Sequence, residues 1–301
     1  MLEPERPSKF YKYVNPDVGK LILRSRRMRW SSPKLFNDDY DCFYSIAPKF
    51  DMDAVLKKVM KLMAEKITQE EDPVFHPNAP SASFLRFFRL GFKGRSAQDV
   101  EKILSGEGDT KEYLKNFRAL CDEVEEQWKN ERNDLRILCV CEDYRNQLLW
   151  TKYADHHQGI ALELEAKREL DSALLAAVEV EYTEDPPALA TEEEWIAACI
   201  GLAPLPTGSE VWRRQVFTKS KDWEHENEWR VITKKRSDET LAYANCEFLP
   251  SELTAVYFGC NISDQDKAEM CSLLQGDLSH VRLFQAKQNP QKPELEFSPL
   301  R

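Results

Sequence analysis

The sequence predicts an α+β fold with a mixed or antiparallel central sheet and an inserted helical subdomain. Apolar residues alternate by two in short runs near both ends of the chain, whereas they recur at helical spacing between residues 51 and 133. Strand patterns therefore flank a helical stretch. We expect a core domain formed by residues 1–50 and 134–301 and a helical insertion formed by residues 51–133.

The first strand pattern covers residues 9–14 and ends at Asn15-Pro16. Five cations follow within residues 20–29, where they fit either a solvated edge strand or one wall of an anion pocket. Residues 30–41 then contain Ser-Ser-Pro and Asn-Asp-Asp groups. Their short polar side chains bond to the local backbone, so they predict turns.

The predicted insertion begins with an amphipathic helix over residues 51–67, in which Val55, Val59 and Ile67 share one face. Residues 70–83 carry three prolines and predict a loop. Two further helices are expected over residues 96–104 and 110–128.

The remaining strand patterns follow the insertion. They lie at residues 135–141, 158–165, 178–182, 243–249, 253–258 and 280–284. Ser263 is an N-cap signal for a helix over residues 264–274.

Composition indicates a globular protein of 301 residues with 42% hydrophobic residues and a formal charge of −10. This acidity argues against a broad phosphate-binding surface but is compatible with a local basic pocket. No run approaches the ~20 apolar residues of a membrane helix, and the first residues lack the order of a signal peptide. We expect a cytoplasmic protein without membrane contact. Its eight cysteines lack paired metal or redox spacing, which predicts reduced thiols.

Residues 219–233 concentrate carboxylates, two tryptophans and an arginine. If the chain is extended from Glu224, then Glu226, Glu228 and Arg230 share one face, and Trp229 lies on the other. One interpretation is a half-buried strand with solvated glutamates. The other is a pair of functional carboxylates that face the largest cleft of the molecule.

Several stretches together resemble the bacterial domain of unknown function 2971 family. They are residues 11–13, 30–38, 149–163, 181–182, 219–230 and 256–259, in this order. A more distant resemblance is to the ADP-ribosyltransferases, which use a basic residue on an early strand, a Ser or Tyr motif and a late Glu. Lys12 or Arg24 stands for the first, Ser31-Ser32 for the second, and Glu226-x-Glu228 for the third.

This second resemblance implies an enzyme that consumes NAD, in the setting of a bacterial toxin or a phage-defence effector. Glu228 would hold the ribose hydroxyl and offset the cationic transition state, and Glu226 would orient or deprotonate a protein or nucleic-acid acceptor. Tyr13 or a tryptophan would stack on nicotinamide, and cations would meet the pyrophosphate. The implied nucleotide-binding residues are Lys12, Tyr13, Arg24, Ser31, Ser32, Lys219, Trp223 and Arg230, with Trp30 and Trp229 as further stacking candidates.

Two alternatives remain open at this point. Asp155 followed by Glu163 and Lys167 has the outline of a metal-dependent nuclease. A non-enzymatic sensor or interaction module is the other alternative, in which the conspicuous aromatic residues belong to the core and His156-His157 is a loop pair. No metal site is expected from the histidines, because no third ligand sits at helical spacing.

Overall fold

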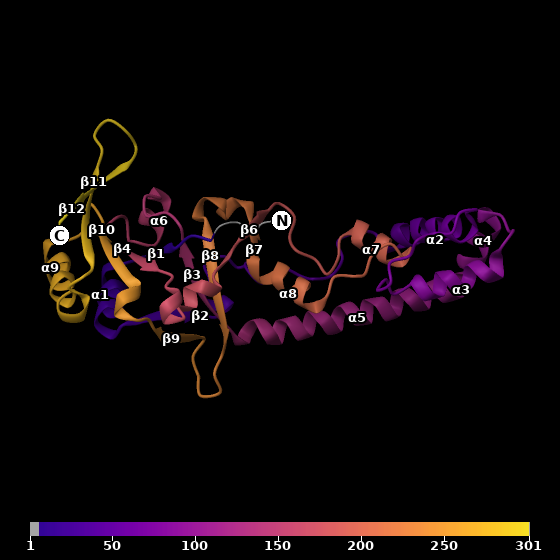
Figure 1. Cartoon of the computed structure of the whole chain (residues 1–301), viewed down its shortest axis with the longest axis horizontal. Helices are drawn as coiled ribbons and strands as arrows, with labels where there is room; N and C mark the ends of the chain where they lie inside the picture. Colours follow the sequence, from indigo (N-terminus) through magenta and orange to yellow (C-terminus); the bar gives the residue numbers. More distant parts are fainter. Residues whose placement is uncertain (1–5, 301) are drawn as a thin grey trace. The chain divides into compact units, whose positions relative to one another are not determined.

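A computed structural model describes residues 6–300, without the side chains of residues 107–111, 113, 114 and 120. The chain divides into two compact units (Figure 1). The first, here the sheet unit, comprises Met1–Asp41, Arg132–Glu184 and Lys219–Arg301. The second, here the helical unit, comprises Cys42–Glu131 and Asp185–Thr218.

The sheet unit contains a mixed sheet in the order β12-β11-β10-β4-β1-β3-β2-β9, with β8 paired to β3 and β5 paired to β8. Among the strands that the structure describes, only β10 and β11 pair in parallel, so the predicted α+β class with a mixed sheet is confirmed. The strands are β1 Lys9–Val14, β2 Arg27–Ser31, β3 Leu135–Cys141, β4 Ile160–Glu165, β5 Val178–Glu179, β8 Glu228–Lys234, β9 Tyr243–Glu247, β10 Leu253–Phe258, β11 Arg282–Gln288 and β12 Leu295–Pro299. A separate two-stranded sheet pairs β6 (Glu181–Thr183) with β7 (Thr218–Ser220).

One face of the large sheet packs against α1 (Pro16–Ser25) and α9 (Asp264–Leu273). Alternate strand residues such as Phe10, Val140 and Trp229 enter this core because successive side chains point to opposite faces. The other face carries a smaller aromatic cluster that includes Tyr11 and Trp150 and packs against α6 (Gln147–Lys152). This second face also carries the charged residues described below.

The cation-rich segment is a helix followed by β2, which lies between β3 and β9, so the edge-strand alternative is wrong. The anion-wall alternative stays a prediction, because Arg29 of β2 lines the pocket described below. Asn15 caps α1 by accepting from Val18 N, and Pro16 occupies the first turn, where its missing N–H is harmless. Lys20 and Arg24 then pair with acids of α9, at 3.0 Å to Asp266 and 3.0 Å to Glu269 respectively.

The helical unit is built from α2 Met52–Thr68, α3 Ala82–Phe92, α4 Ala97–Leu104, α5 Glu107–Asp134, α7 Glu192–Cys199 and α8 Gly208–Phe217. Helices α2, α4 and α5 lie where the 3.6-residue periodicity predicts them, and α3 is a further helix that lies outside the predicted ranges. Val55, Phe117 and Trp195 share one buried cluster. Residues 185–218 therefore pack with the earlier helices, although they were predicted in the core domain.

Short 3-10 helices complete the fold. They are η1 Pro33–Leu35, η2 Arg168–Leu170, η3 Ala173–Ala176, η4 Lys221–Glu226, η5 Pro250–Glu252 and η6 Gly276–Leu278. Within the described residues, no helix combines the length and apolar character that crossing a membrane requires. The same residues contain no disulfide among the eight cysteines.

Candidate functional site

The backbone of the site is β7, η4 and β8, joined by Asn227. Ser220 caps η4 by accepting from Asp222 N, and Asn227 ends it in the left-handed conformation with φ 43°. The strand β8 begins only at Glu228. The expectation of a continuous strand from Glu224 is therefore wrong, because the local cap and the left-handed Asn favour a helical turn through Glu226.

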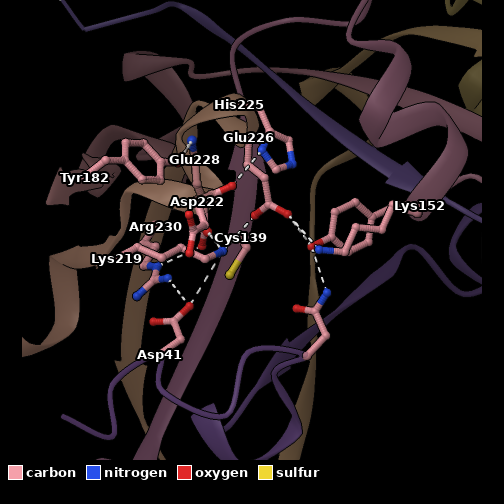
Figure 2. Close-up of polar contacts among 12 residues, drawn as sticks. Asp41, Cys139, Lys152, Tyr182, Lys219, Asp222, His225, Glu226, Glu228 and Arg230 are labelled. Carbon is pink, nitrogen blue, oxygen red and sulfur yellow. Dashed lines mark hydrogen bonds and ion pairs between the residues drawn. The ribbon is translucent and has the colours of Figure 1, made fainter. Parts of the chain in front are cut away.

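The two glutamates nevertheless converge on one lysine (Figure 2). Lys219 Nζ lies 2.7 Å from Glu226 Oε2 and 2.8 Å from Glu228 Oε2. The Lys219 side chain is only 4% exposed. A single buried ammonium group thus bridges both carboxylates that the sequence singled out.

Arg230 extends this arrangement to a third carboxylate. Its Nε donates to Glu228 Oε1 at 2.8 Å, and its Nη2 donates to Asp41 Oδ2 at 2.5 Å. Asp41 also lies 3.7 Å from Lys219. We call Asp41, Lys219, Glu226, Glu228 and Arg230 the ionic cluster. All five residues are buried, so these ion pairs are shielded from the solvent that weakens surface pairs.

Electrostatics fix the charge state of the ionic cluster. Burial raises the pKa of Glu228, but the attraction of Arg230 and Lys219 is larger and holds that pKa well below its usual range. Burial lowers the pKa of Lys219, and the three carboxylates more than reverse this, so its pKa lies well above the ordinary value. The pKa of Asp41 is raised by burial and by Glu228, against the pull of Arg230. At neutral pH, Lys219 is therefore protonated and Glu228 ionised.

Glu226 also contacts Lys152, the last residue of α6, and Tyr153, the residue after that helix. Tyr153 OH donates to Glu226 Oε1 at 2.7 Å and accepts from Asn37 Nδ2 at 3.2 Å. Lys152 Nζ lies 3.3 Å from the same carboxylate oxygen and 3.3 Å from the ring centroid of Trp223. Burial lowers the pKa of Lys152 despite the nearby Glu226.

A pocket of about 290 Å³ opens beside the ionic cluster. Its lining comprises Tyr11, Lys12, Tyr13, Arg29, Ser31, Leu35, Phe36, Asn37, Asp41, Ile137, Cys139, Val140, Cys141, Leu149, Tyr153, Lys219, Glu226 and Glu228. The prediction that both glutamates face a pocket is met by this lining. The expectation that it is the largest is wrong, because pockets of about 390, 550 and 670 Å³ lie elsewhere in the described part of the chain.

Six of the predicted site residues come together in this pocket. They are Lys12, Tyr13, Ser31, Lys219, Glu226 and Glu228. Lys12 Nζ donates to the Cys139 carbonyl at 2.7 Å, and Tyr13 OH donates to the Asp143 carbonyl at 2.8 Å. Residues from β1, β2 and the 219–228 segment therefore meet, although long stretches of sequence separate them.

The other predicted residues lie outside the pocket lining. Arg24 is on α1 with its guanidinium on Glu269, so it is not available beside Lys12. Ser32 is buried, and its Oγ has no partner within the part of the chain that the structure describes. The Trp223 ring makes a cation–π contact with the Lys152 ammonium group, and Arg230 lies within the ionic cluster.

The stacking candidates Trp30 and Trp229 are both in the core on the opposite face of the sheet. Alternation explains this, since Trp229 is adjacent in sequence to the two residues of β8 that belong to the ionic cluster. Neither ring can therefore contact a ligand in the pocket. Tyr13 is the one stacking candidate that the pocket retains.

Sequence reasoning missed Asp41, Asn37 and Tyr153. Asp41 and Asn37 lie in the turn-rich segment, where local hydrogen bonding sufficed to explain them. The sensor alternative counts Tyr153 among the conspicuous aromatic residues that belong to the core. The usable signal was its position in the stretch of residues 149–163, which was part of the family resemblance.

Glu163 and Lys167 of the predicted nuclease pattern pair with other residues and not with each other. Glu163 accepts from Tyr257 OH at 2.8 Å and from Lys9 and Arg282, while Lys167 lies 3.7 Å from Glu165. Asp155 is in a left-handed turn with φ 47°. Among the described residues, no group of three or more His, Cys, Asp or Glu is placed to hold a metal ion.

Comparison with protein families identifies one match. A family model described as a protein of unknown function (DUF2971) matches residues 149–231. This segment includes Tyr153 and four of the five residues of the ionic cluster, with Asp41 outside it. Comparisons with curated proteins and with solved structures give no match.

Proposed function

We propose that this pocket binds the nicotinamide–ribose part of NAD and that the protein is an ADP-ribosyltransferase-like enzyme. The observation that carries the proposal is the convergence of Lys12, Ser31 and the Glu226/Glu228 pair on one pocket. These are the three elements that the transferase resemblance implies. A volume of about 290 Å³ suits one half of a dinucleotide, and the other half would extend outside.

The proposed reaction breaks the C1′–N bond between ribose and nicotinamide. Nicotinamide leaves with the electron pair, and the ribose develops oxocarbenium character that a nearby carboxylate stabilises. Glu228 lines the pocket, and Arg230 and Lys219 keep it ionised at neutral pH. Its negative charge is thus present before the ligand arrives, which reduces reorganisation during the reaction.

The transfer half of the reaction needs a base for the acceptor. The acceptor nucleophile attacks C1′, and its proton passes to a carboxylate within hydrogen-bonding reach. Glu226 suits this role, because it lines the pocket and its Oε1 accepts from Tyr153 OH, which in turn accepts from Asn37. Tyr13 and Phe36 supply aromatic surface for nicotinamide, and Lys12 supplies a cation for the phosphates.

The test compares wild type with Glu228→Gln and with Glu224→Gln. Glu224 is exposed on η4 and serves as the matched control. Each protein is incubated with labelled NAD and a cell extract, and nicotinamide release and label transfer are measured. Protease and nuclease treatment of the product then identifies a protein or nucleic-acid acceptor.

We expect wild type and Glu224→Gln to transfer label, and Glu228→Gln to lose on the order of 10²–10³-fold in turnover. NAD affinity should change far less in Glu228→Gln. The proposal fails if all three proteins release nicotinamide at the uncatalysed rate with every extract. It also fails if Glu228→Gln retains wild-type turnover.

A second candidate function is a sensor module that binds a nucleotide without cleaving it. The observation that favours it is that each carboxylate oxygen of Glu228 already accepts a hydrogen bond, one from Lys219 and one from Arg230. A carboxylate with these ion pairs can stabilise the fold without contacting a substrate. NAD binding by calorimetry without nicotinamide release would support the sensor over the enzyme.

A further inference from the structure

A second polar cluster lies on the same sheet face, centred on Glu163 of β4. Its side chain is 2% exposed and accepts hydrogen bonds from five donors. The donors are Tyr11 OH at 3.2 Å, Tyr257 OH at 2.8 Å, Thr254 Oγ1 at 2.7 Å, Lys9 Nζ at 2.8 Å and Arg282 Nη2 at 2.7 Å. The proposed transferase reaction uses none of these contacts, although Tyr11 also lines the pocket beside the ionic cluster.

Glu163 holds two cations that remain accessible. The side chains of Lys9 and Arg282 are 39% and 50% exposed. An ammonium group has three donors and a guanidinium has five, so a single bond to Glu163 leaves most of their donors for a ligand. The buried carboxylate thus orients Lys9 and Arg282 and leaves hydrogen-bond donors on both side chains for a ligand.

Two adjoining pockets share Lys9 and Arg282. The first, of about 670 Å³, is lined by aromatic rings that include Tyr144, Phe284 and Phe297 and by the charged residues Arg145, Glu294 and Glu296. The second, of about 390 Å³, adds Lys167, His280 and two hydroxyl residues, with Glu165 as its acidic member. We call the two together the Glu163 pocket.

The two halves of the Glu163 pocket differ in chemistry. In the first half, Tyr257 stacks on Tyr144 at 4.3 Å and on Phe284 at 4.8 Å, which makes a continuous aromatic layer. Tyr144 and Phe284 are themselves half-buried and present part of this layer to the pocket. In the second half, Lys9, Lys167 and Arg282 gather positive charge in a protein whose formal charge is −10.

We infer that the Glu163 pocket binds a nucleotide, with its base against the aromatic layer and its phosphate between Lys9 and Arg282. An aromatic surface binds the face of a base, and paired cations bind phosphate oxygens. The aromatic half carries Arg145 together with Glu294 and Glu296, whereas the second half gathers three cations around one acid, so the phosphate is favoured in the second half. This arrangement fixes the orientation of the nucleotide.

This site is separate from the pocket beside the ionic cluster. The two share only Tyr11, whose hydroxyl is directed to Glu163. Glu163 and Glu228 are three strand spacings apart, about 14 Å at the usual spacing between paired strands. A nucleotide at the Glu163 pocket is therefore a second ligand, whether or not the first pocket cleaves NAD.

The experiment measures binding of AMP, adenosine and inorganic phosphate to the full chain by calorimetry. Arg282→Gln removes the exposed cation, and Lys9→Gln removes its neighbour. Lys287→Gln is the matched control, because Lys287 is also exposed and lies on the same strand β11. Glu228→Gln tests independence from the first pocket, and circular dichroism checks that each variant is folded.

We expect AMP to bind wild type, Lys287→Gln and Glu228→Gln alike, and to bind Arg282→Gln and Lys9→Gln about tenfold more weakly. Adenosine and phosphate should each bind wild type more weakly than AMP. The inference is overturned if AMP does not bind, or if folded Arg282→Gln and Lys9→Gln both bind as wild type does. It is also overturned if phosphate binds as tightly as AMP, or if Glu228→Gln alone abolishes binding.

Discussion

Glu163 and Glu228 lie in one row across the same face of the central sheet. Glu163 pairs with Tyr11, Tyr11 pairs with Cys141, and Cys141 pairs with Glu228. Residues directly opposite each other in antiparallel strands project to the same side. Each carboxylate is buried and contacts two cations, Lys9 and Arg282 for the first and Lys219 and Arg230 for the second. The sheet thus carries two charged sites on one face, divided by the neutral pair Tyr11 and Cys141.

Replacing Lys219 by Met should destabilise the protein by about 3–5 kcal/mol, because buried carboxylates lose the ammonium that bridges them. The measurement is the free energy of unfolding in urea. Lys221→Met is the control, since Lys221 is exposed and pairs with exposed Glu184; it should change stability by less than about 0.5 kcal/mol. Equal effects of the two substitutions would contradict the bridging role of Lys219.

The stability that Glu228 contributes should depend on pH. Its pKa in the folded protein lies below the ordinary value of 4.5, because Arg230 and Lys219 outweigh the effect of burial. The contribution is therefore complete above pH 4.5 and is lost as the pH falls below this value toward the folded-state pKa. The difference in unfolding free energy between wild type and Glu228→Gln should shrink between about pH 7 and about pH 3.5. A difference that widens on acidification would show the opposite sign of linkage.

Tyr153→Phe should cost about 2 kcal/mol, because Glu226 loses a hydroxyl donor at 2.7 Å in a mostly buried setting. Thermal and urea unfolding provide the measurement. Tyr243→Phe is a suitable control, since the contact of Tyr243 with Arg29 is made by its ring and survives removal of the hydroxyl. If Tyr153→Phe is as stable as wild type, the Tyr153–Glu226 hydrogen bond has no energetic role.

Gly159→Ala should destabilise the protein by about 3 kcal/mol or prevent its folding. A Cβ at this position would lie 2.1 Å from the Val14 carbonyl oxygen, a backbone atom that cannot move without disturbing the pairing of β1 and β4. Gly91→Ala is the comparison, because no atom lies within 4 Å of its added Cβ. In the exposed part of α3 it should stabilise by up to about 1 kcal/mol. Measured melting temperatures that rank the two variants the other way would refute the packing argument.

The parts of the fold that sequence predicts best are those where one local period decides the outcome. In β8, alternation correctly separates Glu228 and Arg230 from Trp229 and Val231, because a strand has only two faces. Helix α1 is missed because two of its residues, Lys20 and Arg24, belong to a run of five cations that extends to Arg29 and suggests a solvated edge. The Asn15 cap and Pro16 were the better signals.

The candidate site was harder to predict, because its contacts join residues that are distant in sequence. Arg230 binds Asp41 across 189 positions, and no periodicity links two such residues. Local chemistry also prevailed over alternation at Glu226, where the Ser220 cap and Asn227 form a helical turn. Glu226 still reaches Lys219, but through that turn and not through an extended chain.

The helical turn that ends at the left-handed Asn227 sets the residue at which β8 begins, which limits how this part of the chain can vary in length. An insertion or deletion between Lys219 and Glu228 that shifted β8 by one position would turn Arg230 toward the apolar core and Trp229 out of it. Evolutionary insertions and deletions should therefore be absent from this stretch in working relatives. Residues 235–238, which are exposed after β8, have no such constraint and can change in number.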